Sequence, residues 1–251
     1  MTAAGLARVH PLADLVPVGE SAVRVTGRTG DREKDWVLAH KLARSLHERT
    51  TGVSASAVPT YESVLVEFDA SVTDLERVLD DLEASIQDLD VDGPLHQRPR
   101  HFQVPVLYGT QDPSDPFGPD MGRVMETTGL ALPEIVARHS EPTYVIRCLG
   151  APGGSPMVYG PDLGVPVPRL TSPRASVPQG AVSLAGLQAT ITPTTAPGGW
   201  SVIGRTPLRL LELTGDSLVP YRPGDTLRFF PIGTEEFHRR EGERMIAGAA
   251  A

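Results

Sequence analysis

Arginine, glutamine and tryptophan side chains recur among proline- and glycine-rich turns between residues 168 and 207. Arg174 and Arg205 can each present two parallel N–H groups to a carboxylate or a carbonyl. Gln188 offers an amide that both donates and accepts, and Trp200 offers a flat apolar ring with one N–H donor. This combination predicts a site for a small anionic or amide substrate.

A purely structural interpretation of these residues stays open beside the functional one. The run Pro197 to Trp200 can form a tight turn whose indole packs against the core, and an arginine beside a turn often donates to its carbonyl groups. Gly198 and Gly199 lack a side chain, so the backbone there can approach a ligand closely. Only the cluster as a whole therefore favours a site.

Other chemical motifs are missing from the sequence. It contains neither a G-x-x-x-x-G-K-[ST] loop nor a G-x-G-x-x-G after an expected strand, so no phosphate cradle is predicted. Its seven histidines form no H-E-x-x-H motif, and the one cysteine, Cys148, lies in an apolar run where a buried, inert thiol is expected. We therefore predict no metal site and no cofactor bound directly to this chain.

Composition restricts the class of protein further. A formal charge of −8 argues against binding to a nucleic-acid backbone. There is no run of eighteen apolar residues, and no apolar segment near the amino terminus precedes a small-residue cleavage site, so neither membrane insertion nor export is expected. A single cysteine excludes an intrachain disulfide, and together these points lead us to expect a cytoplasmic location.

The part of the chain before residue 110 alternates between helix and strand patterns. Leu38, Leu42 and Leu46 follow the spacing of an amphipathic helix over 35–47, and a second helix is expected over 73–89. The order β-α-β-β-α-β predicts a split βαβ domain, with two helices on one antiparallel sheet. Its strands are expected from the β-rich runs at 18–25, 53–58, 63–68 and 102–108.

The pattern changes in the second half, where glycine and proline interrupt short β-rich runs. Two short helices are expected around 121–128 and from Pro133 onward. Closely spaced short strands without helices between them predict an all-β barrel. These runs lie at 144–149, 181–187, 190–192, 200–203, 208–213 and 226–231.

Several spaced motifs resemble one protein family. Its members include the first subunit of allophanate hydrolase, the B subunit of 5-oxoprolinase and the sporulation kinase inhibitor KipI. The matching motifs follow the same order over most of residues 10–232, which makes the resemblance specific. They are Gly19-Glu20-Ser21-Ala22, Val58 to Val66, His139 to Tyr144, Arg174 to Pro178, Ala185-Gly186 with Gln188, Pro197 to Trp200, Ile203 to Pro207, and Arg222-Pro223-Gly224-Asp225.

The resemblance implies a fold of two domains. The first is an α+β amino-terminal domain, split βαβ and ferredoxin-like, and the second is an all-β cyclophilin-like barrel. We place the first domain at 10–98, the barrel at 99–233 and a flexible carboxy-terminal tail at 234–251. This fold agrees with the helices and strands expected from the residues alone.

The resemblance also implies a function, that of one component in a heteromeric, ATP-dependent 5-oxoprolinase or allophanate-hydrolase-like amidohydrolase. Such a component would act with a homologous C subunit, similar to the second subunit of allophanate hydrolase, and with a third subunit, and these partners would handle ATP. Fixed donors would stabilise a developing oxyanion. The residues expected to carry catalysis are Arg174, Gln188, Arg205 and His139, and those expected to bind substrate are Tyr144, Gly198, Gly199, Trp200 and Thr206.

Alternatives to this function stay open. A KipI-like regulator would bind a histidine kinase without chemistry. His139, whatever the function, can equally cap the short helix at its C-terminus. A divergent paralogue would act on another small substrate, which the loop Gly150 to Tyr159 suggests because it lacks both phenylalanines of the family's G-F-x-P-G-F-x-Y-L stretch. Since aromatic side chains fill much of a ligand pocket, we expect this loop to leave a wider or differently shaped cavity.

Overall fold

The computed structural model describes residues 7–48, 54–214 and 217–248, and these divide into two compact units. The described residues up to Gln97 form unit 1 and those from Arg98 form unit 2. Each unit has its own cluster of buried apolar side chains. Within the described ranges, no helix is both long enough and apolar enough to cross a membrane.

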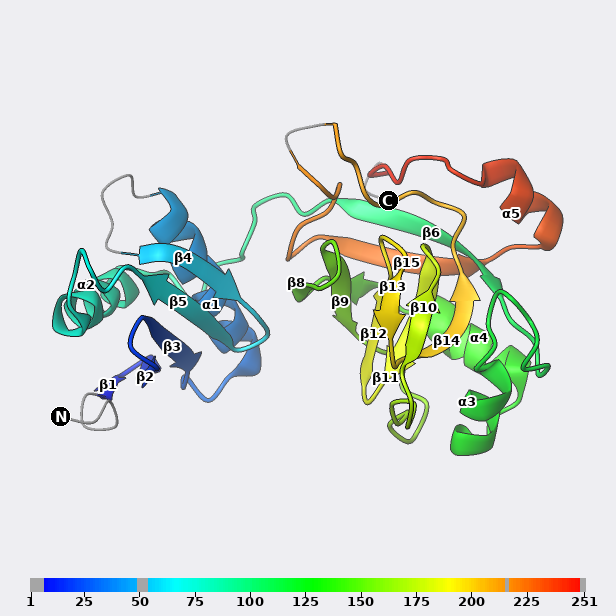
Figure 1. Cartoon of the computed structure of the whole chain (residues 1–251), viewed down its shortest axis with the longest axis horizontal. Coiled ribbons are helices and arrows are strands. Elements are labelled where there is room, and N and C mark those ends of the chain that lie inside the picture. The colour runs from blue at the N-terminus through cyan, green and yellow to red at the C-terminus, as the bar shows by residue number, and fades with distance from the viewer. Residues whose placement is uncertain (1–6, 49–53, 215–216, 249–251) are drawn as a thin grey trace. The chain divides into compact units, whose positions relative to one another are not determined.

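Unit 1 is a five-stranded antiparallel sheet with two helices on one face (Figure 1). The helices bury Leu38, Leu42 and Leu46 of α1, as the sequence spacing predicts, and the apolar face of α2. The strand order is β1-β2-β3-β5-β4. The elements are β1 (Arg8–His10), β2 (Ala13–Val18), β3 (Ala22–Gly27), α1 (Arg32–Glu48), β4 (Ser54–Pro59), β5 (Ser63–Phe68) and α2 (Leu75–Gln87).

The split βαβ arrangement is present in unit 1, but its fourth strand is not the one expected. β3, α1 and β4 form the βαβ unit, and β5 lies between the two strands. The position expected for residues 102–108 is taken by β2, which pairs with β3 from Ala13↔Gly27 to Val18↔Ala22. A hairpin of neighbouring strands closes a much shorter loop than a strand that follows α2, which favours the local pairing.

Unit 2 contains a curled, half-barrel sheet with strand order β7-β15-β6-β14-β11-β12-β9-β8, and a small two-stranded sheet, β10-β13 (Figure 1). It also carries three short helices, two of them at the positions expected from the sequence. The elements are β6 (His101–Tyr108), α3 (Met121–Thr128), α4 (Leu132–Ser140), β7 (Tyr144–Val145), β8 (Cys148–Gly150), β9 (Ser155–Tyr159), β10 (Arg174–Val177), β11 (Ala181–Ala185), β12 (Gln188–Ile191), β13 (Ala196–Gly198), β14 (Ser201–Arg205), β15 (Thr226–Pro231) and α5 (Thr234–Arg240).

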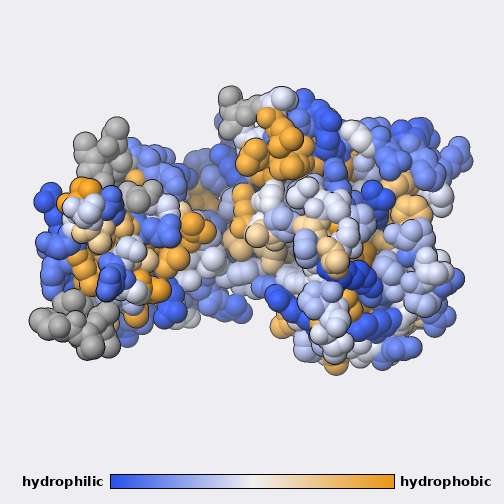
Figure 2. Space-filling model, in the orientation of Figure 1, coloured by the Kyte–Doolittle hydropathy of each residue, from blue (hydrophilic) through white to orange (hydrophobic). Residues whose placement is uncertain are grey.

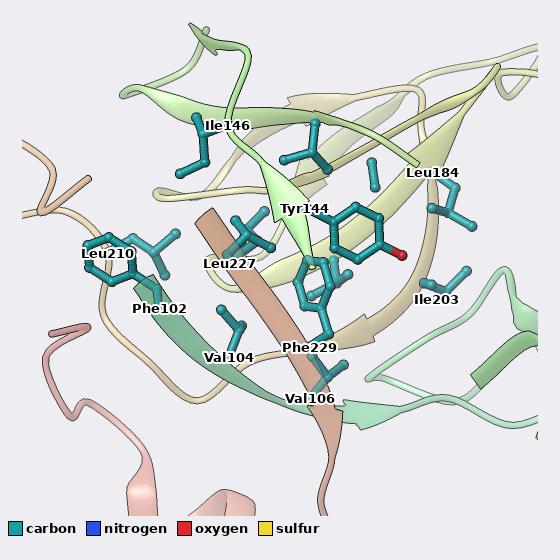
Figure 3. Close-up of a cluster of buried hydrophobic side chains, with 14 of the residues drawn as sticks. Phe102, Val104, Val106, Tyr144, Ile146, Leu184, Ile203, Leu210, Leu227 and Phe229 are labelled. Atoms are coloured by element: carbon teal, nitrogen blue, oxygen red, sulfur yellow. The ribbon is translucent and has the colours of Figure 1, made fainter. Parts of the chain in front are cut away.

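One short segment, 144–150, connects the two edges of the curled sheet. At its start β7 pairs with β15, and at its end β8 pairs with β9. Between them the Ile146 amide donates to the Asp225 carbonyl at 2.9 Å and the Arg147 amide donates to the Met157 carbonyl at 2.8 Å. The sheet therefore encloses a core of buried side chains, which Figure 3 shows around Tyr144 and Phe229.

Asp225, from the Arg-Pro-Gly-Asp motif, fixes the first residues of two central strands. Its buried carboxylate accepts from the Arg100 guanidinium at 2.6 and 2.9 Å. It also accepts from the backbone amides of Arg100 at 2.9 Å and Arg222 at 3.0 Å. A buried carboxylate with this many donors holds the start of β6 beside the start of β15, which run parallel.

The expectation of a flexible tail at 234–251 differs from the structure over residues 234–248. α5 buries Phe237, whose ring centroid lies 5.0 Å from that of Phe117. Met245 is also buried, and the Gly248 amide donates to the His101 carbonyl at 2.9 Å. Two apolar anchors within a charged segment are therefore enough to order it; residues 249–251 lie outside the described part.

Candidate functional site

An open pocket of about 370 Å³ lies on unit 2 where β11 ends and β12 begins. Two of the residues expected from the sequence line it, Gln188 at the start of β12 and Trp200 just before β14. The other lining residues are Pro166, Val167, Pro168, Arg169, Ala185 and Gly186. Its wall is therefore mostly apolar with a few polar groups, as small-molecule sites usually are.

Arg169 supplies the guanidinium of this pocket, which sequence reasoning did not assign to it. Its guanidinium carbon lies 5.7 Å from the centroid of the Trp200 ring, a cation–π distance. Arg169 is exposed, so the N–H groups that face away from the indole can reach a ligand. The signal in the sequence is the rigid Pro166-Val167-Pro168 run, which fixes Arg169 next to the buried Val167.

Arg123, on α3, holds the two walls of the pocket together. One of its guanidinium nitrogens donates to Ser201 Oγ at 2.7 Å, and another donates to the Arg169 carbonyl at 3.3 Å. Beside them the Leu170 amide donates to the Gly199 carbonyl at 2.8 Å. These bonds fix the Arg169 backbone against the strand that carries the Trp200 indole.

Arg174 lies outside this pocket lining and binds a buried carboxylate of the protein itself. Its Nη1 and Nη2 donate to the two oxygens of Asp120 at 2.8 and 2.7 Å. Asp120, in turn, accepts from the Val202 amide at 2.7 Å, so α3 is tied to both β10 and β14. The guanidinium fork expected to meet a substrate carboxylate is therefore occupied by Asp120.

Arg205 and Thr206 lie beside a turn of the chain. Arg205 Nε donates to the Gln179 carbonyl at 2.9 Å, and its guanidinium carbon lies 5.7 Å from the Phe237 ring centroid. The buried Thr206 donates its amide to the Gly180 carbonyl at 2.9 Å. These contacts are those of the structural interpretation, in which an arginine holds a turn.

Gly198 and Gly199 each lie against another part of unit 2. Gly198 pairs with Arg174 in the β10–β13 ladder, and a Cβ placed there would lie 3.0 Å from Val177 Cγ2. At Gly199 a Cβ would lie 3.5 Å from Pro173 Cγ. The two glycines thus allow close packing of the segment that precedes the indole.

His139 and Tyr144 are buried in the core of unit 2. The Tyr108 hydroxyl lies 2.7 Å from His139 Nδ1, the Phe229 ring centroid lies 4.3 Å from that of the imidazole, and the Tyr144 hydroxyl donates to the His139 carbonyl at 2.9 Å. Burial lowers the pKa of His139 to about 3 and raises the pKa of both tyrosines. His139 is therefore neutral at physiological pH, and its Nε2 has no hydrogen-bond partner in the described part of the chain.

The nine expected site residues thus fall into separate groups. Gln188 and Trp200 share the pocket, and His139 and Tyr144 share the core. Arg174 with Gly198, and Arg205 with Thr206, belong to the scaffold around turns and strand pairs, while Gly199 supports the pocket wall through its carbonyl. The pocket as found presents one guanidinium, one carboxamide and one indole.

This set of groups can bind and polarise a ligand but offers little for proton transfer. The guanidinium suits a carboxylate, the carboxamide can pair with an amide of the ligand, and the indole can cover a flat or saturated ring. Among the lining residues there is no carboxylate, imidazole or thiol. Any base or nucleophile for hydrolysis must therefore come from outside this lining.

Two other expectations concern the thiol and metals. Cys148 is buried, and burial raises the pKa of its thiol to about 11, so it is inert as predicted. Across residues 7–48, 54–214 and 217–248, no three His, Cys, Asp or Glu residues lie together in a way that could hold a metal ion.

The loop Gly150 to Tyr159 ends beside the pocket, where Tyr159 pairs with Gln188 across β9 and β12. Tyr221 donates its hydroxyl to the Gly154 carbonyl at 3.0 Å, and Tyr159 carries the Arg147 guanidinium 5.2 Å above its ring. No residue of this loop borders the pocket at Trp200. The change in cavity shape expected from this loop stays a prediction.

Comparisons with known proteins cover both units. A family model described as carboxyltransferase domain, subdomain C and D, matches residues 13–220. The B subunit of 5-oxoprolinase from Bacillus subtilis (strain 168) is 29% identical over 238 residues, which are 90% of this chain and 95% of that protein.

Among solved structures, that of TTHA0988 in space group P212121 has a TM-score of 0.65 and 28% identity over 84% of this chain. The chain spans 40% of the length of the TTHA0988 chain. The urea carboxylase of Kluyveromyces lactis has a TM-score of 0.71 over 94% of this chain and 24% of its own, at 15% identity, which is a likeness of fold alone.

Proposed function

The chain belongs to the carboxyltransferase domain family, subdomain C and D, and on that basis we propose that it is one component of a 5-oxoprolinase-type complex. The support is that relatives from Bacillus subtilis, Escherichia coli O157:H7 and Haemophilus influenzae are all named as the B subunit of 5-oxoprolinase. The B. subtilis alignment takes in nearly the whole of that protein, so both units of this chain belong to the proposed assignment.

Within that complex, the pocket at Trp200 binds the small-molecule substrate. The observation that carries this assignment is the convergence of Arg169, Gln188 and Trp200 on one open hollow. Arg169 holds the substrate carboxylate and Trp200 covers its ring. Gln188 donates its amide N–H to the ring carbonyl, which favours negative charge on that oxygen as the C–N bond is attacked.

The remaining chemistry comes from partner chains. The pocket lining contains no base and no nucleophile, and we propose that partner chains supply those groups and the site for ATP. A homologous C subunit and a third subunit are the proposed partners. The open mouth of the pocket leaves room for a partner to complete it.

Substrate binding can be tested through tryptophan fluorescence. The chain has two tryptophans, Trp200 at the pocket and the buried Trp36 in α1, so a Trp36→Phe variant reports on the pocket alone. Titration with 5-oxoproline should change its emission in a saturable way, and proline, which lacks the ring carbonyl, should bind more weakly. Arg169→Ala should abolish the response, whereas Arg239→Ala on α5 should not.

Assembly is tested separately from the pocket. Purification of the tagged chain from its native cell should recover companion chains, and the recovered complex should convert 5-oxoproline to glutamate with ATP. A companion-free chain with no such activity would refute the complex. An active complex whose turnover survives Arg169→Ala would refute only the pocket assignment.

A further inference from the structure

The unit 1 sheet has an open face on which exposed apolar side chains lie among polar ones. Side chains alternate along the strands, so Leu15, Val23, Val64 and Val66 lie under α1 and α2 while their neighbours point the other way. In a half-covered antiparallel sheet these outward neighbours are normally polar. Here they include Val9, Val18, Val58 and Leu65, which are 68, 43, 54 and 37% exposed.

The strand register arranges these residues in rows across the face. One row crosses four strands in the order Val16, Arg24, Leu65, Val58. The next row runs Val18, Ala22, Glu67, Ser56. Figure 2 shows hydrophobic residues on the surface of this unit over β3 and β5. We refer to these eight residues as the open-face strip.

Two opposite charges lie in the open-face strip, on a diagonal between β3 and β5. Arg24 makes no ion pair or hydrogen bond through its side chain with any residue that the structure describes. Among the described residues, the Glu67 side chain accepts one hydrogen bond, from Ser56 Oγ at 2.6 Å. If a partner covers this strip, Arg24 becomes buried and then requires an anion on the partner's surface. The strip itself contains such an anion, Glu67.

We propose that a second copy of this chain covers the open-face strip, so that two unit 1 sheets stack face to face. In a two-fold interface the same patch meets itself, and residue i of one copy contacts residue j of the other in both directions. Arg24 of each copy then faces Glu67 of its partner, with the valines and Leu65 packed around these pairs. This interface is additional to the proposed contacts with other kinds of chain.

The size of the face indicates how tight the dimer is. Five strands at a spacing of about 4.8 Å, each about 3.3 Å per residue over six residues, give a face of roughly 20 by 20 Å. That is roughly 400 Å² on each copy, or about 800 Å² in total, which is below the range of stable interfaces and is the size of a weak, transient one. We therefore expect a dissociation constant in the micromolar range rather than a permanent dimer.

Sedimentation velocity of the full chain from about 1 to about 200 µM, a range that brackets micromolar affinity, tests the proposal. The wild-type chain should pass from monomer to dimer across this range. Arg24→Glu or Glu67→Arg alone should raise the dissociation constant at least tenfold, because each puts like charges opposite one another. Arg77→Glu, the same charge change on the helical side of unit 1, should leave it unchanged, and circular dichroism should show all variants folded.

Charge exchange distinguishes a second copy from any other occupant. The double variant Arg24→Glu with Glu67→Arg should regain the wild-type dissociation constant, and an equimolar mixture of the two single variants should form a heterodimer. A monomer at every concentration, or a dimer indifferent to both reversals, would overturn the proposal. The proposal would also be overturned if the double variant failed to dimerise. That result would assign the open face to a different protein.

Discussion

Polar side chains of unit 2 occupy two regions, the interior and the pocket, which differ in the hydrogen-bond and charge partners available to these side chains. In the interior, Arg174 donates both arms of its fork to Asp120, and His139 meets Tyr108 among aromatic rings. At the pocket, Arg169 is exposed and has the Trp200 indole beside it. The same residue type therefore holds the fold at one position and is available to a ligand five residues away.

Burial of the partner decides the role of each arginine. Asp120 is almost fully buried, so its charge depends on Arg174 and on the Val202 amide. Within the described part of the chain, no buried carboxylate is paired with the Arg169 guanidinium, which lies over the Trp200 ring. Interior groups should then affect stability when changed, and pocket groups should affect binding.

The largest effect is expected at Arg174. Arg174→Ala leaves the Asp120 carboxylate buried with one backbone donor, which should lower the free energy of unfolding by about 3 kcal/mol. Urea denaturation followed by circular dichroism measures this change. Arg169→Ala is the matched control and should cost less than about 0.5 kcal/mol; equal losses for the two variants would remove the distinction between the regions.

Acid should act on the interior through His139. Its pKa is about 3 in the folded chain against an ordinary value of 6.5, so between these limits the unfolded chain binds a proton that the folded chain does not. Stability therefore falls as the pH drops below 6.5, at about 1.4 kcal/mol per pH unit. From about pH 6.5 to about pH 5 this histidine should account for roughly 2 kcal/mol.

His139→Phe provides the comparison for this pH effect. The phenyl ring keeps the packing against Phe229 but has no proton to gain. Stability curves of the two proteins between about pH 5 and about pH 7.5 should therefore differ in slope. Parallel curves would mean that His139 is protonated in the fold as readily as out of it.

A smaller effect is expected for Arg169→Lys at the pocket. Lysine keeps the positive charge but loses the two-pronged geometry toward a carboxylate, so 5-oxoproline affinity should drop about tenfold, equivalent to about 1.4 kcal/mol. Fluorescence titration in the Trp36→Phe background measures it. Unchanged affinity would show that Arg169 acts only as a point charge, and the unfolding free energy should not move.

The smallest effect is expected for Gln188→Leu. The substitution keeps the approximate size of the side chain but removes one neutral hydrogen bond, which contributes about 1 kcal/mol, or roughly a fivefold loss of affinity. The same titration applies, with Gln103→Leu on β6 as a control for a surface glutamine. A loss as large as that of Arg169→Ala would give Gln188 a greater part than the proposal assigns.

Much of the local structure was predictable because it depends on neighbours in sequence. The leucine spacing indicated α1, and the alternation of Val64 and Val66 indicated β5. The placement of β6 was not predictable in the same way, since its pattern indicates a strand but not which sheet it joins. Its parallel partner β15 begins 125 positions later, at Thr226↔His101.

The candidate site shows the same limit. Gln188 and Trp200 were identified from their setting among turns, and both line the pocket. Arg174 was expected to meet a substrate, since nothing in the sequence indicates that Asp120, 54 residues away, accepts from both of its terminal nitrogens. Whether a guanidinium binds a ligand or a carboxylate of the protein depends on which groups the tertiary structure places beside it.

The position of β15 between β6 and β7 has a consequence for synthesis on the ribosome. Every strand of the unit 1 sheet has been translated by Phe68, so that sheet can assemble early. The curled sheet instead waits for Thr226, since until then β6 and β7 lack the strand that joins them. A premature stop codon even late in the message would therefore release a nascent chain with a finished first unit and an unclosed, apolar second one.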